Sequence, residues 1–341
     1  MQTTQPVQDT RNQSNLRLQF WIAVASSVLL IAKFIAYYIT NSVAVLTDAL
    51  ESIVNVAAGL IGLYSLYISA KPKDTDHPYG HGKAEFISAA VEGTLILAAG
   101  TIIIYKSSKS FFIPQGISQI NTGIYLIGAT GIVNWILGWI TFQQGKKNNS
   151  LALIASGKHL QTDSYSTFAI ILGLILIVAT GQVWIDSVVA IIFGFVIIYT
   201  GYQIMRKSLA GIMDEADMTL LSDMVNVLNK NRNDNWVDLH NLRVIKYGNM
   251  LHVDCHLTVP WYLNVQQAHE EIDVLGKLIR KDFGEALELF VHSDGCQYFQ
   301  CHICEKKACH VRQHDFEKEI VWTINNTLQN KRHGIDYAVN K

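Results

Sequence analysis

The sequence carries almost no net charge, and this absence excludes one large class of partners. Its 27 Lys and Arg residues are balanced by 28 Asp and Glu residues, which leaves a formal net charge of -1 at pH 7. Proteins that bind nucleic acid rely on an excess or a cluster of positive charge to neutralise phosphates. We therefore expect no nucleic-acid partner.

Charged residues of either sign are also scarce, at 16% of the 341 residues, whereas 50% of the residues are apolar. The apolar residues are concentrated before Met213, and the remainder has the charge density of a soluble domain. The composition therefore predicts a membrane half joined to a water-soluble half.

Six apolar stretches are long enough to cross a bilayer as helices. A helix of about 20 residues spans the roughly 30 Å hydrocarbon core. The stretches that meet this length are 17–39, 42–70, 85–108, 122–144, 151–180 and 183–206. The first lacks a small-residue cleavage site and lies too far from the N-terminus to be a removed signal peptide, so we expect it to be retained. The predicted fold of this half is an all-α six-helix transmembrane bundle.

The Lys and Arg residues predict the orientation of this bundle. Cytoplasmic loops of membrane proteins carry an excess of Lys and Arg. In a six-span arrangement only Lys106 and Lys109 fall on one side, and the other side receives Arg11, Arg17, Lys71, Lys73, Lys83, Lys146, Lys147, Arg206 and Lys207. This asymmetry predicts that both termini are cytoplasmic.

Cysteine is absent before Cys255, so all five cysteines fall in the half that is predicted to be cytoplasmic. The cytoplasm keeps thiols reduced. Metal binding is therefore favoured over a disulfide framework.

Two predicted helices carry polar stripes inside apolar sequence. Asp48, Glu51 and Asn55 share one helical face, and so do His159 and Asp163, four residues apart. Glu51 lies about nine residues from the outer end of its span and His159 about nine from the inner end of its own, which puts both roughly 14 Å deep. The two stripes therefore meet near the membrane midplane.

Glu51, Asn55, His159 and Asp163 could together give one nitrogen and three oxygen donors to a divalent ion. The alternative is that these groups only hydrogen-bond neighbouring helices and hold the bundle together. Buried carboxylates are costly for that purpose, which favours the metal site. Asp48 lies nearer the outer surface, where it is either a helix-start group or a ligand on the route into the site.

Five segments form a recognisable set when they are taken together: SVAVLTDALES, DTDHPYGHGKAE, KHLQTD, WIDSVVAI and LFVHSD. Through them the sequence resembles the cation diffusion facilitator family of divalent-metal transporters, and the resemblance runs from about residue 17 to Asp294. It implies a transport site of paired i, i+4 ligands on the second and fifth spans, which correspond here to Glu51, Asn55, His159 and Asp163. Glu51 and Asn55 depart from the usual ligands at their positions.

The resemblance also implies two metal sites outside the membrane and a homodimer formed through the soluble domain. The first site, in a cytoplasmic loop, corresponds to Asp74, His77 and His81; a plain solvated loop is the alternative. The second, in the cytoplasmic domain, corresponds to His240, His269, His292 and Asp294; surface histidines without a role are the alternative there.

The soluble half reads as an α+β domain. Amphipathic helices are predicted over 215–230 and 264–282, and strands over 238–247, 249–259 and 286–292. This αββαβ order fits a small two-layer, ferredoxin-like or metallochaperone-like domain. Alternation in the second strand puts Cys255 on the core face and His252, Asp254 and His256 on the opposite face.

Beyond Asp294 the chain adds a cysteine-rich tail. Cys296, Cys301, Cys304 and Cys309 form C-x4-C-x2-C-x4-C, and four thiolates can close a tetrahedral zinc site. A structural or sensing zinc is favoured over unligated thiols, and an iron–sulfur cluster is a weaker alternative. A terminal amphipathic helix is predicted over 315–329.

These expectations divide the chain into a cytoplasmic N-terminal tail (1–16), a six-span domain (17–208), a metal-binding dimer domain (209–295) and the cysteine-rich tail (296–341). The predicted function is proton-coupled efflux of a divalent transition metal, Zn²⁺ first, through the lipid bilayer of a bacterial inner membrane. A Fe²⁺ or Mn²⁺ exporter of the same family and a non-transporting membrane metal sensor are the alternatives. An enzyme is not expected, because no substrate pocket is recognisable.

Overall fold

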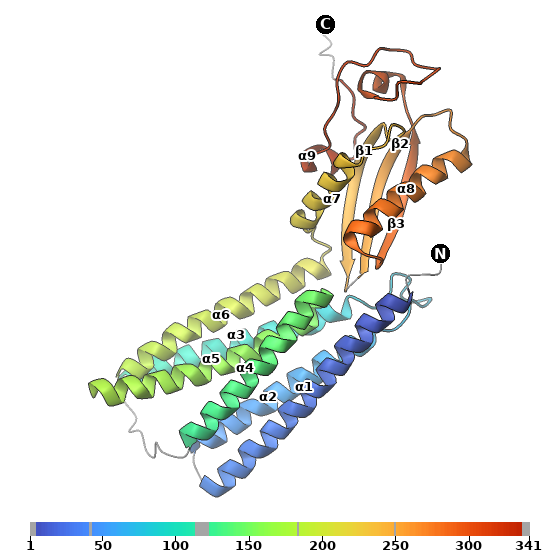
Figure 1. Cartoon of the computed structure of the whole chain (residues 1–341). Coiled ribbons are helices and arrows are strands. Elements are labelled where there is room, and N and C mark those ends of the chain that lie inside the picture. Colours follow the sequence, from blue (N-terminus) through green and yellow to red (C-terminus); the bar gives the residue numbers. More distant parts are fainter. Residues whose placement is uncertain (1–4, 41–42, 113–122, 183, 249, 336–341) are drawn as a thin grey trace. The chain divides into compact units, whose positions relative to one another are not determined.

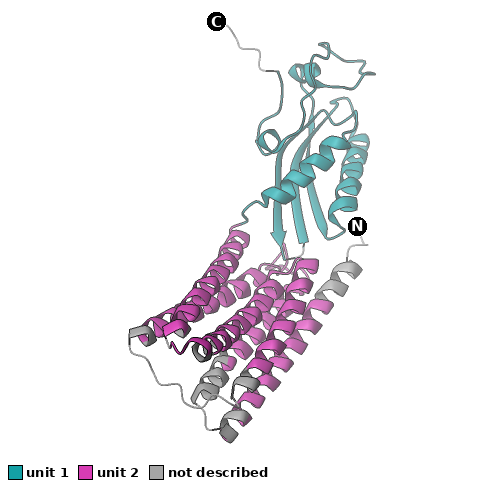
Figure 2. Ribbon diagram, turned by 60° about the vertical axis from the view of Figure 1, so that its left-hand side comes forward, with its two compact units in different colours: residues 1–7, 214–341 teal, residues 8–213 magenta. Residues whose placement is uncertain are grey.

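The chain forms two compact units. The computed structural model describes residues 5–40, 43–112, 123–182, 184–248 and 250–335. One unit comprises residues 8–213, and the other consists mainly of residues 214–341 (Figure 2). The division at Met213 coincides with the change in composition along the sequence.

The described residues of the first unit form six long helices (Figure 1). Each of the six predicted apolar stretches lies in one of them to within a few residues. The helices are α1 (Gln5–Thr40), α2 (Val43–Ser69), α3 (Ala84–Phe112), α4 (Gly123–Asn148), α5 (Leu151–Thr180) and α6 (Trp184–Ile212).

The helical unit has apolar side chains on its outside and polar ones inside. Trp21, Ile31 and Phe195 are each more than half exposed, whereas Gln19 and Glu92 are fully buried. This distribution suits a surrounding of lipid rather than water. Among the described residues, three stretches are long and apolar enough to cross a membrane: Gln13–Ile35, Ala84–Lys109 and Ser187–Ile212.

Glycines allow α4 and α5 to pack closely. A Cβ atom at Gly157 of α5 would lie only 2.6 Å from the Phe142 backbone nitrogen and 2.8 Å from the Gly138 carbonyl oxygen of α4. Small residues permit such an approach between membrane helices. Because His159 follows two residues after Gly157, this contact sets the position of His159 in the bundle.

The second unit has the αββαβ order that the sequence predicts. Its elements are α7 (Met218–Lys230), β1 (Asp238–Tyr247), β2 (Met250–Val259), α8 (Val265–Phe283) and β3 (Leu287–Gly295). The sheet order is β1-β2-β3, in which β1 and β2 are antiparallel and β2 and β3 are parallel. Strand β3 continues beyond its predicted end at residue 292 to Gly295, and this extension includes Asp294.

Alternation along the strands gives the sheet one apolar and one polar face. Leu239 and Leu257 belong to the apolar face, where Leu221 of α7 and Leu275 of α8 complete the core. Cys255 lies there too, at 3% exposure, and burial raises the pKa of its thiol to about 12. This confirms the prediction of a core thiol. The histidines of β1, β2 and β3 are left on the opposite face.

The predicted terminal helix over 315–329 is wrong. Only α9 (Ile324–Thr327) is helical there, and a short 3₁₀ helix, η1 (Tyr298–Ile303), lies earlier in the tail. The backbone hydrogen bonds of the tail go to other segments: the Glu317 amide donates to the His302 carbonyl (2.8 Å) and the Trp322 amide to Asn229 Oδ1 (2.9 Å). Burial of Trp322 in the core, at 2% exposure, holds this segment against the domain without a helix.

Candidate metal sites

Helices α2 and α5 bring three of the four predicted transport ligands together. His159 Nε2 lies 2.9 Å from Asn55 Oδ1, and Asn55 Nδ2 donates a hydrogen bond to Asp163 Oδ2. His159 is 6% exposed. Glu51 and Asp48 lie on α2, but their side chains are outside the described residues.

The Asn55 amide connects the imidazole and the carboxylate in one polar chain. Its oxygen accepts from His159, so Nε2 carries the proton in this arrangement, and its NH₂ group donates to Asp163. A metal ligand needs a free lone pair on nitrogen or oxygen. An ion that uses His159 Nε2 as a ligand must therefore replace the hydrogen bond between His159 and Asn55.

Lys33 of α1 is a buried cation next to α2 that the sequence analysis missed. It is 4% exposed, and its ammonium group donates a hydrogen bond to Ser52 Oγ at 2.7 Å. Ser52 is the neighbour of Glu51 in the chain. The available signal was a single lysine inside the apolar stretch 17–39, since charged side chains within spans mark functional positions.

The loop after α2 gathers Asp74, His77 and His81, as the resemblance implies. His77 Nδ1 lies 3.0 Å from Asp74 Oδ1, and His81 Nε2 lies 3.3 Å from Asp74 Oδ2. The three donor atoms lie within 4.8 Å of one another. The His77 backbone N–H holds the pKa of Asp74 below its ordinary value, against a smaller effect of burial. These groups are compatible with a cation site near the protein surface.

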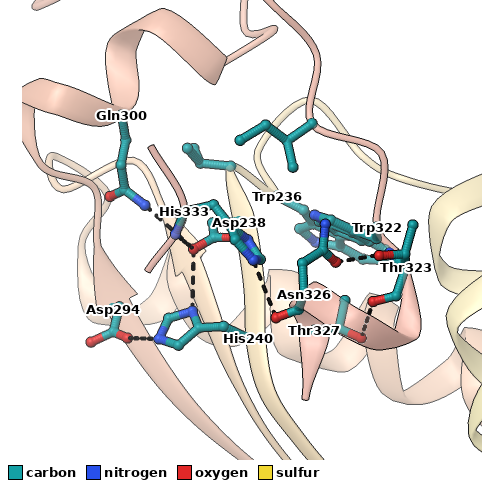
Figure 3. A network of polar contacts seen from close by, with 12 residues as sticks. Trp236, Asp238, His240, Asp294, Gln300, Trp322, Thr323, Asn326, Thr327 and His333 are labelled. Carbon is teal, nitrogen blue, oxygen red and sulfur yellow. Dashed lines mark hydrogen bonds and ion pairs between the residues drawn. The ribbon is translucent and has the colours of Figure 1, made fainter. Parts of the chain in front are cut away.

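The polar face of the sheet gathers His240, His256 and Asp294, whose donor atoms also lie within 4.8 Å of one another. Strand register explains the cluster, because His240 of β1 pairs with His256 of β2 and His256 pairs with His292 of β3. Asp294 Oδ2 lies 3.6 Å from His240 Nε2 and 3.4 Å from His256 Nδ1. Figure 3 shows the His240 ring directed at Asp294. We call this cluster the sheet site.

The sheet site differs from the ligand set that the resemblance implies. His256 belongs to the cluster but was not predicted as a ligand, although the alternation of β2 already put it on the polar face. His292 lies at the rim, 66% exposed and 3.4 Å from Asp294 Oδ1. His269 of α8 is not brought to the cluster; it is 67% exposed, and its nearest carboxylate is Asp273 at 4.0 Å.

Outer partners fix the orientation of the sheet-site ligands. Asp238 Oδ2 lies 3.2 Å from His240 Nδ1, so the opposite ring nitrogen faces Asp294. Arg332 donates to Asp294 Oδ1 at 2.6 Å, which leaves Oδ2 directed at the histidines. Such outer contacts orient metal ligands and raise their affinity for the ion.

The tail also holds Asp238 in its charged form. The His333 backbone N–H donates to Asp238 Oδ2 at 3.0 Å, and the His333 ring contacts Oδ1. Burial raises the pKa of Asp238, but the contacts with His240 and His333 outweigh it and hold that pKa far below its ordinary value. The pKa of His333 is raised in return, since Asp238 outweighs the effect of burial.

The four tail cysteines do not form a preformed cluster of this kind. Among the described residues, three metal donors lie close together at two places only: in the loop, at Asp74, His77 and His81, and in the sheet site. Cys304 is buried, and Cys296, Cys301 and Cys309 are partly buried.

The fold defines a helical membrane protein with polar side chains buried between its helices, joined in sequence to an α+β unit that carries clustered histidine and carboxylate groups. The family model for the cation efflux transmembrane domain matches residues 20–213, and that for the cytoplasmic domain of cation efflux proteins matches residues 218–296. The chain belongs to the cation diffusion facilitator family of metal transporters.

Relatives extend over both units. An uncharacterized transporter of Synechocystis sp., sll1263, is 33% identical over 235 residues, which cover 69% of this chain and 76% of the relative. The manganese efflux system protein MneP of Bacillus subtilis is 25% identical, with 83% and 96% covered. The cation-efflux pump FieF of Shewanella oneidensis is 22% identical, with 82% and 95% covered. The matched residues of the cytoplasmic model end at residue 296, so most of the cysteine-rich tail lies beyond it.

Proposed function

We propose that this chain exports a divalent transition metal from the cytoplasm in exchange for protons, with Zn²⁺ as the first candidate cargo. The observation that carries the proposal is the contact of His159, Asn55 and Asp163 across α2 and α5. All six long helices would cross the membrane, with both termini in the cytoplasm, as the Lys and Arg asymmetry predicts.

Proton coupling follows from competition for the same lone pairs. A metal needs deprotonated His159, Asp163 and Glu51, and protons bind to these same atoms. The site therefore holds either the ion or protons. Movement of helices that exposes the site alternately to the two sides of the membrane then exchanges one for the other.

Mn²⁺ and Fe²⁺ are the second candidates. Asn55 offers a neutral amide oxygen, so His159 would be the only nitrogen donor among the four proposed ligands. Oxygen-rich sets suit Mn²⁺ better than thiolate-rich or imidazole-rich sets do. The similarity to the manganese efflux protein of Bacillus subtilis also supports Mn²⁺ as a candidate cargo.

The sheet site would act as a cytoplasmic metal sensor in a homodimer. The match to the cytoplasmic domain of cation efflux proteins supports dimerisation through this unit. Metal bound by His240, His256 and Asp294 would favour one arrangement of the two protomers and so bias transport.

The test is a transport panel in proteoliposomes that contain the purified full chain. Zn²⁺, Mn²⁺, Fe²⁺, Co²⁺, Cd²⁺ and Ni²⁺ are offered in turn while the internal pH is recorded. Uptake of at least one ion together with opposite proton movement is expected. Absence of flux for every ion, with metal still bound at the sheet site, would identify a membrane metal sensor instead. Flux without a pH change would remove the proton coupling.

A further inference from the structure

We propose that Cys296, Cys301, Cys304 and Cys309 bind one zinc ion, as a site separate from the transport and sheet sites. These four residues are called the tail thiol site below. Most of this segment lies beyond residue 296, where the match to the cytoplasmic family domain ends. The proposal does not depend on the transport function.

Backbone and ring contacts hold both ends of the cysteine motif beside the same segment. The Cys296 N–H donates to the Val259 carbonyl at the end of β2 at 2.9 Å. Three residues further along, the Tyr262 ring packs against the His310 ring, with 4.6 Å between the ring centres. His310 follows Cys309 directly in the chain. The first and last cysteines of the motif therefore both lie near the segment that follows β2.

The Tyr262 hydroxyl lies in the same region. Burial raises the pKa of its hydroxyl to about 12, and contact with Cys309 and the charges of Cys296 and Cys304 add to the shift. The hydroxyl is buried, yet it makes no hydrogen bond of ordinary geometry with any described residue. A buried polar atom without a partner is rare in folded proteins and calls for a missing neighbour. A zinc ion and its thiolate ligands would supply one.

The loop that carries the thiols is held in place by one arginine. Arg312 donates to the backbone carbonyl groups of Cys301 (2.9 Å), Cys304 (2.9 Å) and Lys306 (2.8 Å). These bonds fix the turn around the central C-x2-C segment. A C-x2-C spacing on a fixed turn is the usual way in which two thiolates reach one zinc ion.

The sulfur atoms must still draw closer for zinc to bind. Zinc–sulfur bonds of about 2.3 Å require tighter spacing than a group of free thiols needs. The metal would supply this contraction, because it deprotonates its thiol ligands and removes their mutual repulsion. Chain segments beyond the strands, and not the sheet itself, carry Cys301, Cys304 and Cys309, so they can adjust without disturbing the core.

The test measures zinc in the purified full chain under reducing conditions. In the background Asp74→Ala, His240→Ala and Asp163→Ala, which removes one predicted ligand from each other site, one zinc per chain is expected to remain. Replacing the four tail cysteines by Ser should remove it. Cys255→Ala is the matched control, a cysteine of the same domain outside the site, and should keep it. Equal zinc content with and without the tail cysteines would overturn the proposal.

A second measurement does not depend on the folding of the Ser variant. X-ray absorption at the zinc edge of the triple background variant should show sulfur neighbours at about 2.3 Å. Cobalt substitution should add a sulfur-to-metal charge-transfer band. Tyr262→Phe should keep both signals, because four thiolates complete the coordination. Nitrogen and oxygen neighbours alone, an iron–sulfur chromophore, or disulfides in place of bound metal would each contradict a zinc–thiolate site.

Discussion

The site in the helical unit and the sheet site use similar side chains in opposite ways. In the helical unit, Asn55 hydrogen-bonds to both His159 Nε2 and Asp163 Oδ2, so these polar atoms pair with one another. In the sheet site, Asp294 Oδ2 makes no hydrogen bond of ordinary geometry with the described residues and faces His240 and His256. In the first arrangement an amide bridges the imidazole and the carboxylate, whereas in the second two imidazoles surround one buried carboxylate oxygen.

This difference is the one expected between a transport site, which an ion enters and leaves, and a regulatory site, at which an ion stays bound. An ion entering between α2 and α5 must replace existing hydrogen bonds, which lowers its net affinity and allows it to leave again. An ion at the sheet site meets ligands that Asp238 and Arg332 already orient. Preorganisation of this kind strengthens binding. The comparison predicts weak binding of the cargo and tight binding of the sensed ion.

Loss of the α5 pair should have the largest effect. His159→Ala or Asp163→Ala removes one of the ligands proposed for the transported ion, so metal flux into proteoliposomes should fall to the background of empty vesicles. Ser166→Ala on the same helix is the matched control, since its hydroxyl donates to the Thr162 carbonyl of its own helix, and it should retain flux. Transport by either α5 variant at the normal rate would remove the pair from the mechanism.

The next largest effect is expected on metal binding at the sheet site, and two histidine variants test it. His256→Ala should weaken metal binding to the cytoplasmic unit by about 100-fold or more, because one of three ligands is lost. His269→Ala should leave the affinity unchanged, since His269 lies outside the cluster. Isothermal titration of the full chain in the Asp163→Ala background measures both. The reverse ranking would support the ligand set expected from the family resemblance.

Arg332→Ala tests the outer contacts of the sheet site and should have a smaller effect. Loss of the hydrogen bond to Asp294 Oδ1 should reduce metal affinity by about 10- to 100-fold, the usual range for an outer partner. Lys331→Ala is the control, an exposed cation next to it in the chain. The melting temperature of the metal-free protein should change little, which distinguishes positioning of the ligand from a general loss of stability.

The parts of the candidate sites that are local in the chain were predictable from sequence, and the parts that depend on strand register were not. The i, i+4 spacing of His159 and Asp163 and the compact Asp74, His77 and His81 segment follow from chain geometry alone. His256 joins the sheet site only because the pairing of β1 with β2 puts it opposite His240. Alternation gives the face of a residue but not its partner on the next strand.

The tail shows a second limit of sequence reasoning. Residues 315–329 carry an amphipathic pattern, but Trp322 is taken into the core and stacks on Arg232, with the guanidinium carbon 4.5 Å from the ring centre. The contact of Arg332 with Asp294 spans 38 residues. Tertiary packing overrides a local preference of this size, because the helix propensity of a short segment amounts to only a few kcal/mol or less.

Asn55→Asp should have the smallest effect. It tests the role of the Asn55 amide, which links His159 and Asp163 by hydrogen bonds. A carboxylate cannot donate to Asp163, so the polar chain is broken and two acidic groups face each other. The change should alter the preference between Zn²⁺ and Mn²⁺ by less than about tenfold, since it adds charge to an oxygen ligand but no new type of donor atom. One more proton should be exchanged per ion, because the new carboxylate titrates. Competition flux with internal pH recording measures both quantities. An unchanged ion preference and proton count would show that Asn55 does not contact the ion.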